Sequence, residues 1–99
     1  MFGTKGQINA TSTLLKFCEE HGHAPNWISK LKELLILLQN GSRDEFLEKY
    51  ENFKRAGMGS FIDWFPQKIY EHETDEYIET IWWALVGHWD EQIAYAKKS

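Results

Sequence analysis

One cysteine and two histidines near the end of the first predicted helix have the residue types of a metal site. Cys18 and His21 lie one helical turn apart, and His23 follows Gly22, a residue type that commonly ends a helix. A structural zinc site normally uses four ligands, and no fourth is evident here. Residues 71–73, Glu-His-Glu, could also hold a cation, but such a run is typical of a solvated turn. We therefore expect no metal and no other cofactor.

The polar residues that could do catalysis lack partners at a recognisable spacing. The chain contains no nucleophile elbow and no phosphate-binding loop with its lysine. Residues 57–60, Gly-Met-Gly-Ser, could form an anion-binding nest, but two glycines before a helix-capping serine explain the segment better as structure. We expect no enzymatic activity, although the following residues are candidates for it: Ser60, Asp63, His72 and His88.

Acidic residues are concentrated in the last third of the chain. The 99 residues carry 11 Lys and Arg against 15 Asp and Glu, a net charge of −4, which argues against the basic surface of a nucleic-acid-binding protein. Residues 1–68 are nearly neutral. Residues 69–96 contain no Lys or Arg and seven acids, namely Glu71, Glu73, Asp75, Glu76, Glu79, Asp90 and Glu91. This segment is either a solvated face or a surface that attracts a basic partner.

Length and composition predict a single domain over residues 1–99, with residues 1–7 as a flexible N-terminal tail. The single cysteine excludes an intrachain disulfide and suggests a reducing compartment. No stretch approaches the roughly 18 apolar residues of a membrane span, and the N-terminus lacks the apolar core of a signal peptide. We expect a soluble, cytoplasmic protein.

Apolar residues recur at steps of three and four, which predicts an all-α bundle of four main helices. The first two cover residues 8–21 and 25–40; the second begins at Pro25 and ends before Gly41. A capping pair, Ser42 and Glu45, begins the third. Thr74 caps the last, which ends near residue 96. A short helical insertion, residues 61–65, follows the Gly-rich segment, and residues 67–73 fit either turn or helix.

The last helix is predicted to carry a tryptophan away from its core face. At about 100° per residue, Trp83 points about 140° from Ile78, in the same sector as Glu76, Glu79 and Asp90. An indole beside carboxylates suits an anchor for a cationic partner, unless the N-terminal segment or residues 61–65 cover it. The expected core stripe is Ile78, Ile81, Trp82, Leu85, Trp89, Ile93 and Ala96. A third sector, expected to pack against other helices, is Tyr77, Ala84, His88 and Tyr95.

Three segments of the chain form a characteristic combination: Leu14-Leu15-Lys16-Phe17, the Trp27-to-Leu38 helix, and the loop Gly57-Met58-Gly59-Ser60-Phe61-Ile62-Asp63. Together they resemble a family of small bacterial all-helical domains of largely unassigned function. The likeness covers about residues 8–95. It departs at Ala56, where relatives often have glycine, and in the Trp-rich last helix. Proteins of this kind are often encoded beside polymorphic or contact-dependent toxins, so the resemblance implies an immunity protein that neutralises a cognate toxin.

The leading hypothesis is therefore an immunity-type inhibitor that binds a toxin with a basic surface. A nuclease would offer such a surface, because its nucleic-acid groove is basic. Trp83, Glu76, Glu79 and Asp90 are predicted to be central, with Glu71, Glu73 and Asp75 as steering charges. The main alternative is a structural or regulatory protein that self-associates through the aromatic last helix, and a minor one is a hydrolase using Asp63 or a histidine.

Overall fold

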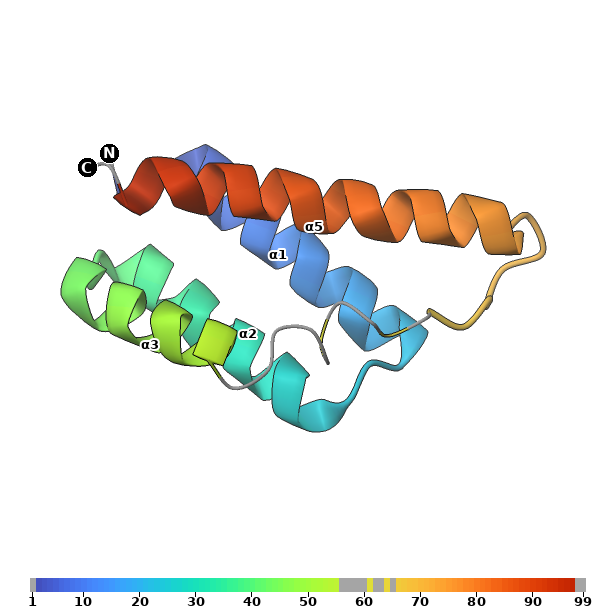
Figure 1. The fold of residues 1–99 in the computed structure, drawn as a ribbon, viewed down its shortest axis with the longest axis horizontal. Helices are drawn as coiled ribbons and strands as arrows, with labels where there is room; N and C mark the ends of the chain where they lie inside the picture. The colour runs from blue at the N-terminus through green and yellow to red at the C-terminus, as the bar shows by residue number, and fades with distance from the viewer. Residues whose placement is uncertain (1, 56–60, 62–63, 65, 98–99) are drawn as a thin grey trace.

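Four helices make up most of the chain in the computed structural model, which describes residues 2–55, 61, 64 and 66–97 (Figure 1). They are α1 (Lys5–His21), α2 (Pro25–Asn40), α3 (Arg43–Arg55) and α5 (Asp75–Lys97), and the described part of the chain contains no strand. The all-α class with four main helices is confirmed. Most of the Gly-rich segment and of the expected insertion, including Ser60 and Asp63, lies outside the described residues.

Helix α1 begins earlier than predicted because a capping box starts it. Thr4 Oγ1 accepts a hydrogen bond from the backbone N–H of Gln7, and Gln7 Oε1 accepts from the N–H groups of Gly3 and Thr4. The ring of Phe2 packs edge-on against Phe46, with 5.3 Å between ring centroids. The expected flexible tail over residues 1–7 is thus corrected, since residues 5–7 are helical and Gln7 is buried.

Local signals set the ends of α2 as predicted. Pro25 occupies its first turn, where a missing N–H costs no helical hydrogen bond. Gly41 follows its last residue with φ of 73°, a left-handed conformation that glycine adopts without strain. The buried face of α2 consists of Trp27, Leu31, Leu34, Leu37 and Leu38, whereas Leu35 is only half-buried.

Helix α5 buries one stripe along its 23 residues, beginning where Thr74 Oγ1 accepts from the N–H of Tyr77. Its buried side chains are Ile78, Trp82, Val86, Trp89, Ile93 and Ala96. Ile81 and Leu85, which were expected in the stripe, lie at its border and are half-buried. No described helix is both long enough and apolar enough to cross a membrane.

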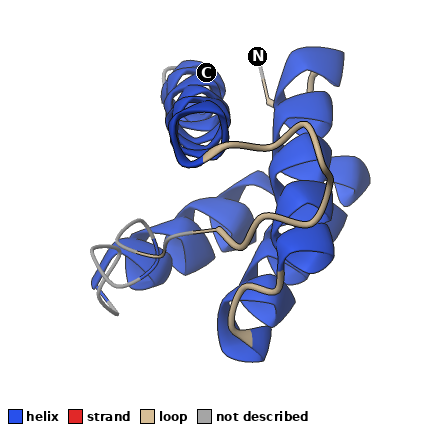
Figure 2. Ribbon diagram, turned by 90° about the vertical axis from the view of Figure 1, so that its right-hand side faces the viewer, coloured by secondary structure: helices blue, strands red, loops and turns tan. Residues whose placement is uncertain are grey.

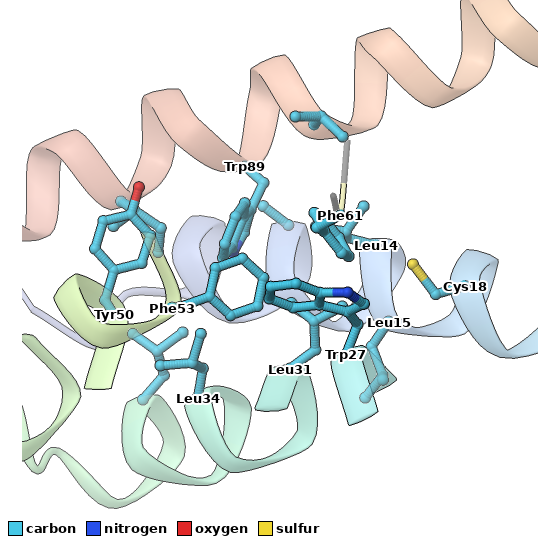
Figure 3. Close-up of a cluster of buried hydrophobic side chains, with 14 of the residues drawn as sticks. Leu14, Leu15, Cys18, Trp27, Leu31, Leu34, Tyr50, Phe53, Phe61 and Trp89 are labelled. Atoms are coloured by element: carbon cyan, nitrogen blue, oxygen red, sulfur yellow. The ribbon is translucent and has the colours of Figure 1, made fainter. Parts of the chain in front are cut away.

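Helix α1 packs against both α2 and α5, and α2 packs against α3. Helices α1 and α5 are antiparallel: Gly6 in the first turn of α1 approaches Gln92, whose Oε1 would lie 2.7 Å from a Cβ at residue 6. Aromatic rings join α3 to α5, with Trp89 edge-on to both Tyr50 and Phe53 (Figure 3). The core therefore lies between α5 and the other three helices.

A short hydrogen-bonded chain ties α5 to α1 inside this core. The indole Nε1–H of Trp89 donates to Thr11 Oγ1 at 3.0 Å, and the Thr11 hydroxyl donates to the backbone oxygen of Gln7 at 2.9 Å. Both Trp89 and Thr11 are fully buried. The indole N–H, which would otherwise be unsatisfied in the core, thus has its acceptor.

The segment that leads into α5 is a turn, and it crosses the C-terminal end of α1 (Figure 2). Residues 67–73, which the sequence left open between turn and helix, contain no helix. Two side-chain contacts hold the segment on α1: Glu73 contacts His21, and Tyr70 contacts Glu20.

Candidate functional site

Trp83 projects from the outer side of α5. Its side chain is 48% exposed, so the prediction that it points away from the core is confirmed. Gly87 follows one turn later, and beyond its two chain neighbours and the backbone of α5 itself, no described atom lies within 4 Å of the position that a Cβ there would take. The indole therefore has open space on the side of the helix that it shares with Gly87.

The acids predicted beside Trp83 have different surroundings. Glu76 and Glu79 are exposed, and neither has an ion-pair partner within the described part of the chain. Asp90 is half-buried, and its Oδ1 accepts from the hydroxyl of Tyr50 at 3.5 Å. Burial, together with the nearby Asp90 charge, raises the pKa of Tyr50. Asp90 thus faces the core as well as the surface, whereas Glu76 and Glu79 face solvent.

Glu73 is buried, which corrects its predicted role as a steering charge. One carboxylate oxygen lies 2.8 Å from His21 Nε2, and the other accepts from the backbone N–H groups of Ile69 and Tyr70. These bonds, that from Tyr70 foremost, lower the pKa of Glu73 to about 2, although burial opposes them. Glu73 therefore holds the turn on α1 and is not available to a partner.

Asp75 is also partly neutralised, since its Oδ1 lies 2.9 Å from the ammonium of Lys68. Lys68 comes directly before the acidic segment in the sequence, and its positive charge offsets one of the negative charges of that segment. Glu71, by contrast, is exposed and has no ion-pair partner among the residues described. Within the described residues, the exposed carboxylates in the first part of the acidic segment that form no ion pair are Glu71, Glu76 and Glu79.

Cys18, His21 and His23, the three residues with the types of a metal site, are all buried. His21 Nδ1 lies 3.0 Å from the Phe17 carbonyl oxygen and Nε2 lies 2.8 Å from Glu73 Oε2, so both ring nitrogens have partners. His23 Nδ1 accepts from the N–H of Ala24. Its Nε2 donates to the backbone oxygen of Phe61, which makes the ring neutral.

Burial shifts the pKa values of His23 and Cys18. It lowers the pKa of His23, and it raises the pKa of the Cys18 thiol to about 12, so that the thiol stays protonated. Among the described residues, no three His, Cys, Asp or Glu side chains converge as metal ligands would.

Three exposed rings lie together where the turn meets α5. His72 stacks on Tyr70 with ring centroids 5.8 Å apart, and Tyr77 meets His72 edge-on at 5.4 Å. The hydroxyl of Tyr70 donates to Glu20 at 3.1 Å. The sequence analysis did not predict this group. Its signal was Ile69-Tyr70, an apolar pair at the start of the acidic segment, and both residues are about half exposed.

The sector of α5 expected to pack against other helices is exposed instead. Tyr77 and Tyr95 are each about half exposed, and Ala84 and His88 are exposed as well. The reason is that α5 lies at the side of the bundle, where α1 and the aromatic residues of α3 cover only one face. His72 and His88 were also candidates for catalysis, and neither makes a hydrogen bond or ion pair to a described acid.

Comparison with known proteins adds no relative: no family model, no curated protein and no solved structure matches this chain.

Proposed function

We propose that this protein binds and neutralises a basic protein partner, as an immunity protein does its cognate toxin, through the outer face of α5 around Trp83. The observation that carries the proposal is a half-exposed indole beside Glu76 and Glu79, two carboxylates without an ion-pair partner within the described residues. The toxin as partner class comes from the resemblance to small bacterial immunity-type domains.

The two parts of this face have different tasks in binding. A tryptophan offers large, rigid apolar area at a small cost in side-chain entropy, and such residues dominate the binding energy of protein interfaces. The carboxylates attract a basic surface before contact, which raises the association rate more than the final affinity. At about 4 Å, the Coulomb attraction of a charge pair is about 1 kcal/mol in bulk water and about 4 kcal/mol near a protein surface, and the cost of desolvating both charges offsets part of it.

The same charges disfavour self-association through this face. A two-fold symmetric dimer would bring identical surfaces together, so Glu76 and Glu79 of each copy would approach those of the other. Like charges placed opposite each other in an interface are unfavourable. A basic partner relieves this repulsion and a second copy of the chain adds to it.

The test is protection of cells that express the toxin encoded beside this protein's gene. Co-expression of the wild-type protein should restore growth, and the purified pair should form a complex. Trp83→Ala should weaken the complex by about 2 kcal/mol or more, which is about thirtyfold in Kd. Ile36→Ala is the matched control, because Ile36 is 54% exposed but lies on α2.

Two results would overturn the proposal. The first is failure of the wild-type protein to protect the cells although it is expressed and folded. The second is a folded Trp83→Ala variant that binds the toxin as tightly as the wild type does, which would remove the face from the interface.

A further inference from the structure

The first two turns of α5 border a shallow hollow of about 370 Å³. Its lining combines one carboxylate, one aromatic ring, two hydroxyls and one aliphatic side chain, which are Glu76, Tyr77, Thr74, Thr80 and Ile81. No basic residue contributes to this lining. The hollow thus offers apolar surface and negative charge within the reach of one long side chain.

The ring of Tyr77, which forms the aromatic wall of the hollow, is held by contacts with the turn. Tyr77 packs against His72, which stacks on Tyr70, and the Tyr70 hydroxyl is bonded to Glu20 of α1. The backbone of the turn is held by the buried carboxylate of Glu73. A wall that is ordered before binding loses little conformational entropy on contact, which favours affinity.

We propose that this hollow binds a long cationic side chain, arginine or lysine, on the same basic partner; the inference rests on the proposed function. The aliphatic stem lies over Ile81, as such stems commonly lie on apolar surface. The cationic head lies against the Tyr77 ring and pairs with the Glu76 carboxylate. The hydroxyls of Thr74 and Thr80 supply further acceptors at the rim.

The position at a helix N-terminus requires a check of the charge balance. Aligned peptide dipoles place roughly half a positive charge at the start of α5, which repels a cation. Glu71, Glu76 and Glu79 are exposed around this end, and no cation pairs with them in the described part of the chain. Three negative charges exceed the dipole's half charge, so the local field favours a cation.

The probe is acetyl-tetraarginine amide, titrated into the isotope-labelled full-length protein and followed by NMR. Resonances of Tyr77, Thr80 and Ile81 should shift and saturate. The tetracitrulline peptide, which has almost the same shape without charge, should leave them in place. Glu76→Gln and Tyr77→Ala should each weaken peptide binding about two- to fivefold. Tyr77→Phe, which keeps the ring face, and Glu91→Gln, an exposed acid late on α5, should leave it unchanged.

The outcomes separate this inference from the proposed function. Equal shifts with both peptides, or shifts confined to the surroundings of Trp83, would overturn the cation site while leaving toxin binding through Trp83 intact. Folded Glu76→Gln and Tyr77→Ala variants with unchanged peptide affinity would overturn it as well. Loss of toxin neutralisation in the Trp83→Ala variant is measured separately and does not depend on this titration.

Discussion

Replacing Thr11 by valine should destabilise the protein because it removes one oxygen atom, Thr11 Oγ1. Valine has nearly the shape of threonine and a similar helix propensity, so it leaves no cavity. It removes the acceptor of the Trp89 indole N–H, which donates to Thr11 Oγ1 at 3.0 Å within a fully buried environment. The Gln7 carbonyl oxygen loses the hydrogen bond from the Thr11 hydroxyl, but it still accepts the helical hydrogen bond from the backbone N–H four residues later in α1.

The expected cost follows from leaving that indole N–H unsatisfied. A buried donor that loses its partner costs about 1–3 kcal/mol, against a total stability of about 5–15 kcal/mol for a domain. For a chain of this length, each kcal/mol corresponds to about 4–8 °C in Tm. We expect Thr11→Val to lower the free energy of unfolding by this amount, with no change in the slope of unfolding against urea.

A double-mutant cycle isolates the hydrogen bond. Trp89→Phe removes the indole N–H, so adding Thr11→Val to that variant should cost little or nothing. Urea unfolding followed by circular dichroism gives the four free energies. The reasoning is refuted if Thr11→Val costs nothing in the wild-type background, or costs the same in both backgrounds.

Two further predictions concern the turn and α5. The pKa of Glu73 is lowered from 4.5 to about 2 in the folded protein, so the stabilisation by its carboxylate is complete above about pH 4.5 and is lost as the pH falls towards 2. Glu73→Gln should lower the urea midpoint at pH 7, and the midpoint of the variant should fall less than that of the wild type between about pH 4.5 and 2. Plots of urea midpoint against pH that run parallel for the two proteins would contradict this. Gly87→Ala should raise the free energy of unfolding by about 1 kcal/mol, because Gly87 lies within a helix and a Cβ there would touch nothing; thermal unfolding measures the change, and a lower Tm would show that the space is not free.

Features set by neighbouring residues were predictable from the sequence. The ends of α2 follow from Pro25 and Gly41, which act on the residues beside them. The direction of Trp83 follows from helical periodicity alone. The early start of α1 also has a local signal in the sequence, since Thr4 and Gln7 have the spacing of a capping box.

Features set by distant residues were not predictable in this way. Glu73 looked like one more surface acid, and its burial depends on His21, 52 positions earlier in the chain. Similarly, periodicity shows that Tyr77 and Tyr95 share a sector of α5, but not that the bundle leaves that sector uncovered. Which acids remain available to a partner is therefore a property of the tertiary structure.

The antiparallel pairing of α1 and α5 also determines how the molecule would respond to a pulling force on its two ends. The contacts of α1 with the C-terminal part of the chain run in order, from Gly6–Gln92 and Thr11–Trp89 on α5 to His21–Glu73 in the turn before α5. Force would load them one after another, as in opening a zipper, and not all at once, as in sliding two rods apart. The contact between α1 and the turn that carries Tyr70 would be the last to bear the force.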